Sequence, residues 1–573
     1  MNRLFHRFLL GLLLAGLSPQ VSAQSPIFSS RAIHHPIVAK QGMVASQHPL
    51  ATEVGLRILQ EGGNAVDAAV GVGFALAVVL PRAGNLGGGG FMLVHDAESG
   101  KTEAINYREM APAAAHRDMY LDSTGQVDNA RTNSSYQATG IPGTVAGLAL
   151  ALEKYGTMSL KEVLKPSIEL AGKGFEVTYD LSRVLKALEK RIRKWPASEA
   201  IFYKGPEGFY EGGDVLIQKD LAWSLEQIAK GGAAAFYEGA VAEKIVADVQ
   251  AHDGLITMED MAAYKPQETE VVWGSFHGYD IASMPPPSSG GVHVIQMLNI
   301  LEKYPLREMG HNSAAYLHLL TECMKIAYAD RSQHLGDPLF WEVPKKGLTS
   351  KDYGDLLRAQ IKTYAARPAA EIAPGNPKDF ESEETTHFTV VDKEGNVVSN
   401  TYTLNFSFGI GAVAEGTGIL LNNEMSDFSA KPGTPNAFGL LGAEANKVEP
   451  GKRPLSSMTP TIVFKDGKPF LATGSPGGSR IITAVLQVIL NATVFEMNMA
   501  EATHAPRVHH QWYPDELFIE QALNYDTRAI LESLGHKLTE RNAMGSTQSI
   551  MLKDGLLYGA SDPRRPDART KGY

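Results

Sequence analysis

The feature that most constrains the fold of this 573-residue chain is a predicted hairpin near residue 390. Two β-rich runs, residues 385–391 and 397–404, flank a polar loop at 392–396 that contains glycine. This pattern is typical of two antiparallel strands joined by a short turn. If Val391 and Val397 close the loop, the pairing of every other residue in the hairpin follows.

That register places Thr385 opposite Thr403, with one hydroxyl facing another at the start of a strand. Threonine is common in strands because it packs well on a sheet, and that interpretation suffices for most threonines. Thr385 differs because it follows residues 365–384, which are rich in alanine, proline and acid and lack any periodicity. We expect this segment to form a mobile loop or linker and to mark the main boundary in the chain.

The N-terminus predicts export. Residues 1–23 contain Arg3 and Arg7, then an apolar run, then Val21-Ser22-Ala23, a site of the kind that signal peptidase cuts. The net charge is −10 even before two arginines are removed, and no basic tract occurs. We therefore expect no nucleic-acid or membrane partner, a small-molecule substrate, and a location in the periplasm or outside the cell.

Cys323 is the only cysteine, so no intramolecular disulfide can form despite export. It lies in a helical pattern, where a buried thiol is the simplest interpretation. With 44% hydrophobic residues, the chain has ample material for a core. The apolar run at 66–80 is shorter than the ~20 residues of a membrane span and is predicted to be a core helix.

Periodicity and turn residues predict an α+β protein. Helices are expected at residues 50–60, 65–80, 145–155, 160–171, 181–195, 221–229, 241–250, 292–303, 314–330 and 481–490. Hairpins are expected at 91–95 with 102–107, 461–464 with 470–473, and 549–552 with 556–560, the last two around Asp-Gly turns. These hairpins indicate meandering antiparallel sheet.

Three places in this pattern can bind an anion. One is the N-terminus of the helix expected at residues 292–303, where a capped helix start is at least an equally good interpretation. Arg108 follows the predicted strand at 102–107, although most arginines at strand ends are merely solvated. Residues 474–480 read Gly-Ser-Pro-Gly-Gly-Ser-Arg between a strand and a helix. A glycine turn at a helix N-terminus presents free backbone N–H groups, which can hold a phosphate or an oxyanion.

Other motifs are absent or incomplete. The sequence lacks a phosphate-binding loop, a dinucleotide fingerprint and a Gly-x-Ser-x-Gly elbow. His504, His509 and His510 have no nearby cysteine or suitably spaced carboxylate, so we expect no metal and no cofactor. A threonine hydroxyl needs a base, and a cut before Thr385 would supply one as a new α-amine with a pKa of ~7.7–8.0.

Seven segments spread over essentially the whole mature chain carry a family pattern: residues 62–69, 85–91, 107–112, 385–387, 436–443, 454–458 and 474–480. In these segments the chain resembles the bacterial γ-glutamyltranspeptidases. The resemblance implies an N-terminal nucleophile hydrolase with a four-layer αββα sandwich. It also implies self-cleavage between Glu384 and Thr385 into a large chain, 24–384, and a small chain, 385–573, which stay together as one fold.

The resemblance further implies a role for each site residue. Thr385 would be the nucleophile, with Thr403 bonded to it, and the Gly477 and Gly478 N–H groups would form the oxyanion hole. The substrate's α-carboxylate would bind Arg108, Ser456 and Ser457, and its α-amine would bind Asn405, Glu424 and Asp427. Phe438 stands at the tip of a lid-like segment where some members have tyrosine, and Glu424 stands where some have glutamine.

The implied reaction transfers a γ-glutamyl group from glutathione or a similar donor to water, an amino acid or a peptide. One alternative is a glutaryl (cephalosporin) acylase, which shares the fold and nucleophile but does not require an α-amine site. Asp427 favours the first reaction. A second alternative, an inactive periplasmic binding protein, does not explain the presence of Thr385, Thr403, Gly477 and Gly478 together.

Overall fold

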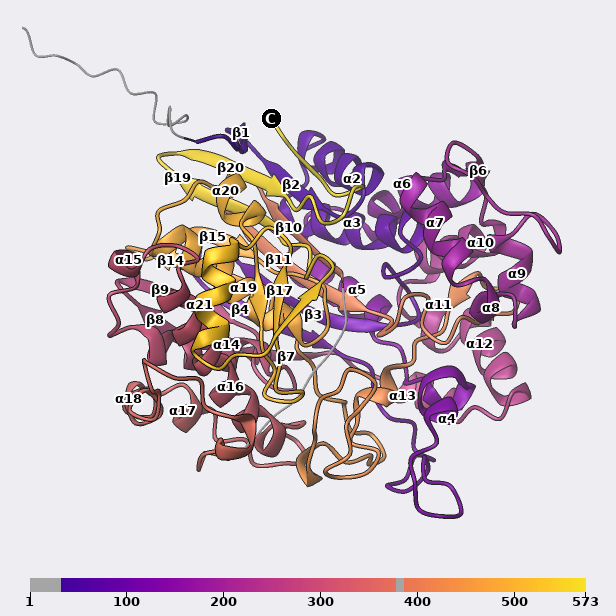
Figure 1. Ribbon diagram of the computed structural model, residues 1–573. Helices are drawn as coiled ribbons and strands as arrows, with labels where there is room; N and C mark the ends of the chain where they lie inside the picture. The colour runs from indigo at the N-terminus through magenta and orange to yellow at the C-terminus, as the bar shows by residue number, and fades with distance from the viewer. Residues whose placement is uncertain (1–31, 378–385) are drawn as a thin grey trace, which may run out of the picture. The chain divides into compact units, whose positions relative to one another are not determined.

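Two seven-stranded antiparallel sheets lie at the centre of the computed structural model, which describes residues 32–377 and 386–573 (Figure 1). In spatial order the first sheet contains β1 (Ile37–Ala39), β20 (Leu556–Ser561), β19 (Gln548–Lys553), β15 (Lys468–Thr473), β14 (Thr461–Lys465), β9 (Tyr279–Ser283) and β8 (Val272–Phe276). The second contains β21 (Arg569–Gly572), β2 (Met43–Ser46), β10 (Thr386–Val391), β11 (Val397–Thr403), β3 (Gly89–His95), β4 (Thr102–Tyr107) and β7 (Gln267–Glu270). The predicted antiparallel meander is confirmed.

The hairpin near residue 390 forms β10 and β11 in the middle of the second sheet. Val391 pairs with Val397 as predicted, and the register continues to Thr386 opposite Tyr402. The next step in this register reaches Thr403, but Thr385 and Glu384 lie outside the described residues. On its other side β11 pairs with β3, so the end of β11 is held within the sheet.

Side chains of the hairpin alternate between two cores. Val391 and Val397 belong to the cluster between the two sheets. Val390 and Val398 belong to a second cluster, which the helices on the outer face of the second sheet complete. The period of two in a strand thus fills one core with each face of the sheet.

Helices cover the outer face of the second sheet. They include α2 (Pro49–Gln60), α3 (Ala65–Val79), α5 (Thr144–Tyr155), α6 (Leu160–Lys173) and α10 (Lys219–Gly231). Every residue of α3 is buried, and its N-terminus is closed by a capping box in which Asn64 and Asp67 exchange hydrogen bonds. A Cβ on Gly71 would lie 2.3 Å from Ile58, so glycine allows α2 and α3 to approach closely.

A second helical layer covers the outer face of the first sheet (Figure 1). It includes α14 (Gly290–Leu301), α16 (Ala314–His334), α18 (Lys351–Arg358), α19 (Arg480–Thr493) and α20 (Met499–His504). Cys323 is fully buried in α16, as predicted. The order helix, sheet, sheet, helix gives the four layers of the predicted sandwich.

The remaining elements connect these layers. The helices are α4 (Asn129–Ser134), α7 (Tyr179–Ala187), α8 (Glu189–Ile192), α9 (Pro196–Phe202), α11 (Ala234–Tyr237), α12 (Ala240–Ala251), α13 (Met258–Ala263), α15 (Leu306–Met309), α17 (Lys345–Leu348) and α21 (Tyr525–Ser533). The short strands are β5 (Phe175–Glu176), β6 (Val215–Leu216), β12 (Val413–Ala414), β13 (Ile419–Leu420), β16 (Val508–His509), β17 (Leu517–Glu520) and β18 (Leu538–Arg541). The 3₁₀ turns of the described residues are η1 (Tyr136–Ala138), η2 (Ala369–Glu371), η3 (Glu424–Asp427) and η4 (Glu444–Asn446). Among the described helices, none combines the length and apolar character that crossing a bilayer requires.

The prediction of a mobile linker is wrong for the described part of that segment, residues 365–377. Ala369 N donates to Asp515 Oδ2 at 2.7 Å, and Trp512 Nε1 donates to the carbonyl of Ala369 at 3.0 Å. Gly375 N donates to Asp330 Oδ1 at 2.5 Å, and its carbonyl lies 2.8 Å from His334 Nε2. The segment has no regular backbone ladder, and side chains from other parts of the chain satisfy several of its polar groups.

No domain boundary falls at this segment either. Residues Pro36–Tyr573 form one compact unit. Both sheets combine strands from before and after this segment, and in the second sheet β10 and β11 lie between β2 and β3. A shift in composition along the chain therefore marked a change of local structure and not the edge of a folded unit.

Candidate active site

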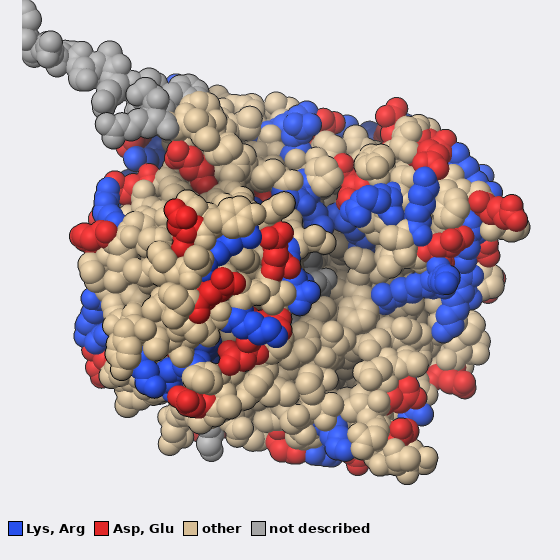
Figure 2. All heavy atoms as spheres, viewed as in Figure 1, with Lys and Arg blue, Asp and Glu red and all other residues tan. Residues whose placement is uncertain are grey.

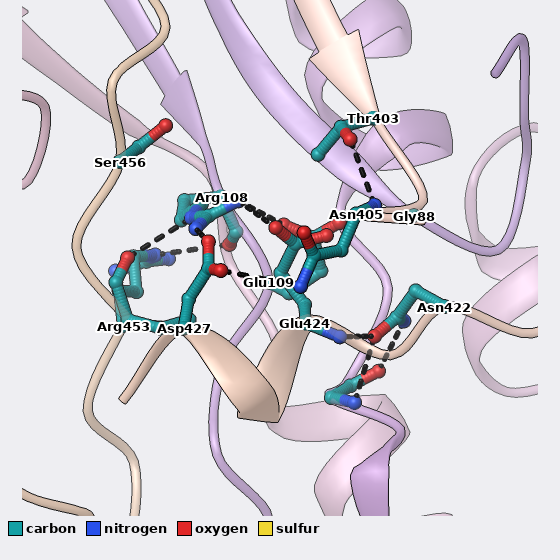
Figure 3. A network of polar contacts seen from close by, with 12 residues as sticks. Gly88, Arg108, Glu109, Thr403, Asn405, Asn422, Glu424, Asp427, Arg453 and Ser456 are labelled. Carbon is teal, nitrogen blue, oxygen red and sulfur yellow. Dashed lines mark hydrogen bonds and ion pairs between the residues drawn. The ribbon is translucent and has the colours of Figure 1, made fainter. Parts of the chain in front are cut away.

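Arg108 lies at the centre of a buried polar cluster beyond the end of β4 (Figure 3). Its side chain has no exposed area, and neither do those of Glu109, Glu424 and Asp427. The guanidinium forms close ion pairs with Glu424 and Asp427, and Glu109 Oε2 lies 3.4 Å away. One buried cation is therefore held in direct contact with three buried carboxylates.

The rest of the guanidinium is also engaged. Arg108 Nε donates to the carbonyl of Pro454 at 2.9 Å, and one terminal nitrogen donates to that of Leu455 at 3.0 Å. An arginine side chain has five N–H donors, and protein acceptors occupy all five. A ligand carboxylate can reach Arg108 only by displacing one of these acceptors.

Glu109, Glu424 and Asp427 share a single cation, the guanidinium of Arg108. Burial is the main cause that raises the pKa of Glu109, Glu424 and Asp427, while Arg108 opposes the shift in each. Burial lowers the pKa of Arg108, but Glu424 and Asp427 outweigh it and raise that pKa overall. Three buried acids around one guanidinium leave room for a second cation.

Asn405 links this cluster to the end of the central hairpin. Its Nδ2 donates to Asp427 Oδ1 at 3.2 Å and to Ser426 Oγ at 2.8 Å. Its backbone N–H donates to Thr403 Oγ1 at 2.8 Å, and its φ of 68° turns the chain sharply after β11. The turn brings Thr403 and the acidic side chains into one region, as Figure 3 shows.

The glycine run before β3 packs directly against this turn. A Cβ on Gly88 would lie 1.8 Å from the carbonyl oxygen of Thr403, so only glycine allows the two segments to approach. Asn85 Nδ2 donates to the same carbonyl at 2.8 Å. The four glycines at 87–90 therefore serve close packing at the site, which the sequence alone did not indicate.

Ser456 and Ser457 are fully buried on the segment that Arg108 holds. Ser456 N donates to the carbonyl of Pro287 at 2.8 Å, and Ser456 Oγ accepts from Met458 N at 3.1 Å. Ser457 Oγ accepts from Arg331 at 2.6 Å. The structure thus places both serines beside the cluster, while their hydroxyls contact other groups.

Gly477 and Gly478 form the glycine turn between β15 and α19. Their φ values are 136° and 63°, which a residue with a side chain rarely adopts. Their carbonyls accept from Arg480 N at 3.2 Å and Ile481 N at 3.0 Å, but neither N–H donates to a described residue. Two adjacent free N–H groups are what a developing oxyanion requires.

Two residues of the cluster carried no role in the sequence prediction. Glu109 adds the third carboxylate, although it stands next to Arg108 in the chain. Asn422 joins three segments, because its Nδ2 donates to the carbonyls of Gly87 and Gly140, each at 2.8 Å, and its Oδ1 accepts from Glu424 N. Its position two residues before Glu424 was the available signal.

One group in the described part of the chain has the composition of a metal site. The ligand atoms of His318, Glu322 and His536 lie within 4.8 Å of one another and are buried. Lys325 Nζ already pairs with Glu322 at 2.8 Å, and His318 uses both ring nitrogens, on His536 at 2.8 Å and on a backbone carbonyl at 2.7 Å. The lysine ammonium occupies the role of a cation, so these residues do not fit a metal.

The lid-like segment lies over the turn that follows β11. The rings of Phe438 and Phe406 meet edge to face with centroids 5.3 Å apart, and the Phe438 carbonyl accepts from Gln511 Nε2 at 3.1 Å. Phe438 thus holds this segment by a contact between aromatic rings, since it lacks the hydroxyl that a tyrosine at this position would offer for a hydrogen bond.

Comparison with known proteins agrees with this geometry. The sequence model of the gamma-glutamyltranspeptidase family matches residues 51–571. The chain is 55% identical over 543 residues to the glutathione hydrolase proenzyme of Escherichia coli, covering 94% of this chain and 93% of that protein.

Solved structures give the same answer for the fold. The gamma-glutamyltranspeptidase of Helicobacter pylori is 44% identical with a TM-score of 0.57, over 58% of this chain and 94% of that one. The cephalosporin acylase of Bacillus halodurans is 28% identical with a TM-score of 0.85, over 96% and 99%. The predicted N-terminal nucleophile hydrolase sandwich is confirmed, and the chain belongs to the gamma-glutamyltranspeptidase family.

Proposed function

We propose that this protein cleaves the γ-glutamyl amide of glutathione and related compounds and passes the γ-glutamyl group to water, an amino acid or a peptide. The Escherichia coli relative is named as a glutathione hydrolase. The observation that carries the proposal is the cluster of Arg108 with Glu424 and Asp427. It offers one cation and several carboxylates to the two charges of an α-amino acid.

Substrate binding at this cluster is an exchange of ion pairs. The α-carboxylate takes the place of Asp427 and Glu424 on Arg108, and those carboxylates, with Asn405, receive the α-ammonium. Each buried charge keeps a partner throughout, so the exchange avoids the cost of an unpaired buried ion. Ser456 and Ser457, which lie on the same segment as the Arg108 acceptors, complete the carboxylate site.

Self-cleavage between Glu384 and Thr385 supplies the reacting group. The exported precursor yields a large chain, 24–384, and a small chain, 385–573, which work together in the periplasm. Thr385 then carries both a hydroxyl and a free α-amine, which acts as the base. The register of β10 and β11 supports this assignment, since it continues from Thr386 and Tyr402 toward Thr403.

The chemistry proceeds in two steps with one nucleophile. Thr385 Oγ attacks the γ-amide carbon while its proton passes to the α-amine, and the Gly477 and Gly478 N–H groups stabilise the oxyanion. The C–N bond breaks and the leaving amine takes the proton, which leaves a γ-glutamyl ester on Thr385. Water or the amine of an acceptor attacks that ester, and the hydroxyl of Thr385 is restored.

Purified protein is expected to contain two chains. Mass spectrometry of the denatured protein should give the masses of residues 24–384 and 385–573, and N-terminal sequencing of the smaller chain should begin at Thr385. This outcome tests export and self-cleavage together. A single intact mass after prolonged incubation would contradict the mechanism.

Asp427→Asn is expected to separate γ-glutamyl transfer from glutaryl transfer. The variant removes the charge that faces the α-ammonium but keeps the size of the side chain. Loss of a charged hydrogen bond costs about 1.5–3 kcal/mol, so KM for a γ-glutamyl anilide should rise roughly 10- to 100-fold.

The matched control is the glutaryl anilide, which has the same carboxylate and chain length but no ammonium. Its KM should change little in Asp427→Asn. Equal losses for the two donors would remove Asp427 from the ammonium site and would favour the acylase reaction.

A further inference from the structure

A basic pocket lies next to the proposed site of acyl transfer. Its walls are formed by Gln47, Arg82, Ala83, Thr403, Leu404, Asn405, Ser407, Pro476, Gly477 and Arg565. Thr403, Asn405 and Gly477 belong to the site described above, whereas Gln47, Arg82 and Arg565 have no role in it. None of these lining residues is acidic.

Two donors in this pocket have no partner among the described residues. Gln47 is 3% exposed, and its Nε2 makes no hydrogen bond. The guanidinium of Arg565 donates to no described acceptor, whereas its neighbour Arg564 is held by Glu520 and Asp562. Arg565 is only half-buried, so water can solvate its guanidinium, but Gln47 is buried. An unpaired donor on a buried side chain is costly, so Gln47 Nε2 points to an acceptor that a ligand supplies.

The charges around the pocket leave an excess of positive charge. Arg82 pairs with Asp180 at 2.9 Å, and Asp180 also binds Arg183 at 2.8 Å. Burial, followed by the nearby Arg565, lowers the pKa of Arg82 to about 10 even with Asp180 and Asp567 nearby. Figure 2 shows Lys and Arg side chains around a hollow in one face of the molecule, consistent with a field that attracts anions.

We propose that Gln47, Arg82 and Arg565 bind the carboxylate of the amino acid or dipeptide that leaves the donor or accepts the γ-glutamyl group. The inference rests on the proposed function. The α-amino acid end of the donor occupies the Arg108 cluster, so the other side of the scissile amide extends past Thr403 and Gly477 into this pocket. A leaving amine and an accepting amine occupy the same position, because acceptance is the reverse of departure.

The ligand chemistry follows from the donors. An arginine fork and a neutral amide N–H₂ suit a planar carboxylate, and a second guanidinium in the pocket adds positive charge to the same site. A neutral leaving group, such as an anilide or an amide, gains nothing from these residues. The pocket therefore selects donors and acceptors that carry a free carboxylate.

The test compares two donors that differ in one charge, γ-glutamylglycine and γ-glutamylglycinamide. Wild-type protein should cleave the first with the higher kcat/KM. Arg565→Gln should lower the ratio of the two kcat/KM values about tenfold, through loss on γ-glutamylglycine alone. Gln47→Met, which keeps the length and removes the donor, should lower the ratio about threefold.

Arg183→Gln is the matched control. Like Arg565→Gln, it removes one positive charge. Arg183 binds Asp180, as Arg82 does, but does not line the pocket, so the ratio of the two kcat/KM values should stay within twofold of wild type. Cleavage of the glycinamide donor reports in every variant that the protein is folded and active.

The possible failures are distinguishable. If wild-type protein cleaves neither donor, the proposed function itself is wrong. If it cleaves both equally, or if Arg565→Gln changes the ratio no more than Arg183→Gln does, the pocket does not bind the carboxylate and the proposed function stands.

Discussion

Thr385→Ala is expected to leave the protein as one uncut chain without transfer or hydrolysis. The substitution removes the only oxygen that the mechanism assigns to attack, both on the Glu384–Thr385 bond and on the substrate. Loss of a nucleophile in a comparable acyl-transfer site costs on the order of 10⁴- to 10⁶-fold in rate. Activity on a γ-glutamyl anilide should therefore fall to background, as measured by release of the anilide.

Two further variants make this result specific. Thr385→Ser keeps a hydroxyl and an α-amine and should retain part of both processing and activity. Thr386→Val replaces a fully buried hydroxyl that has no partner among the described residues, so it should process and react normally. Normal processing of Thr385→Ala would mean that another residue is the nucleophile.

Arg108→Met is expected to damage both stability and activity. It removes the cation among three fully buried carboxylates, and breaking a buried pair in this way costs about 3–5 kcal/mol. The measurement is the free energy of unfolding, followed in denaturant. Arg117→Met is the control, because Arg117 pairs with Glu444 at the surface and its loss should cost below about 1 kcal/mol.

The pH dependence of Arg108→Met gives a second readout. The pKa values of Glu109, Glu424 and Asp427 are raised in the folded protein, mainly by burial. Groups with raised pKa values contribute fully to stability below about pH 4 and lose that contribution as pH rises through the folded pKa. Without Arg108 those values rise further, so the loss of stability should be larger at pH 8 than at pH 5. An equal loss at both pH values would show that the acids are already neutral.

Local patterns predicted the hairpins well, because a turn residue fixes which residues pair. Val391 and Val397 meet as expected, and Asp466-Gly467 and Asp554-Gly555 both adopt positive φ in their turns. Arg108 was also correctly placed at the end of a strand. These features depend on residues close together in sequence.

The contacts of Arg108 could not be predicted from local sequence patterns. Glu424 and Asp427 lie 316 and 319 residues away along the chain, so only the family resemblance brought these side chains into one site. Even that resemblance did not indicate that the acids bind Arg108 when substrate is absent. Gln47, Arg82 and Arg565 likewise meet only because the sheets bring three distant segments together.

The prediction of a mobile linker at residues 365–377 was wrong for a different reason. Composition predicts mobility when a segment has no apolar face to bury, but it does not count polar partners elsewhere. Asp330, Trp512 and Asp515 supply those partners from other parts of the chain. Order in this segment is thus a property of its surroundings, which a local pattern cannot contain.

The two sheets determine how many molecules take part in unfolding. Each sheet combines strands from before and after the proposed cut, so neither product has a complete sheet of its own. Unfolding of the precursor is a one-chain event, whereas unfolding of the cut protein is also a dissociation. Mass action then makes the melting temperature of the cut protein rise with its concentration, while that of the precursor stays constant.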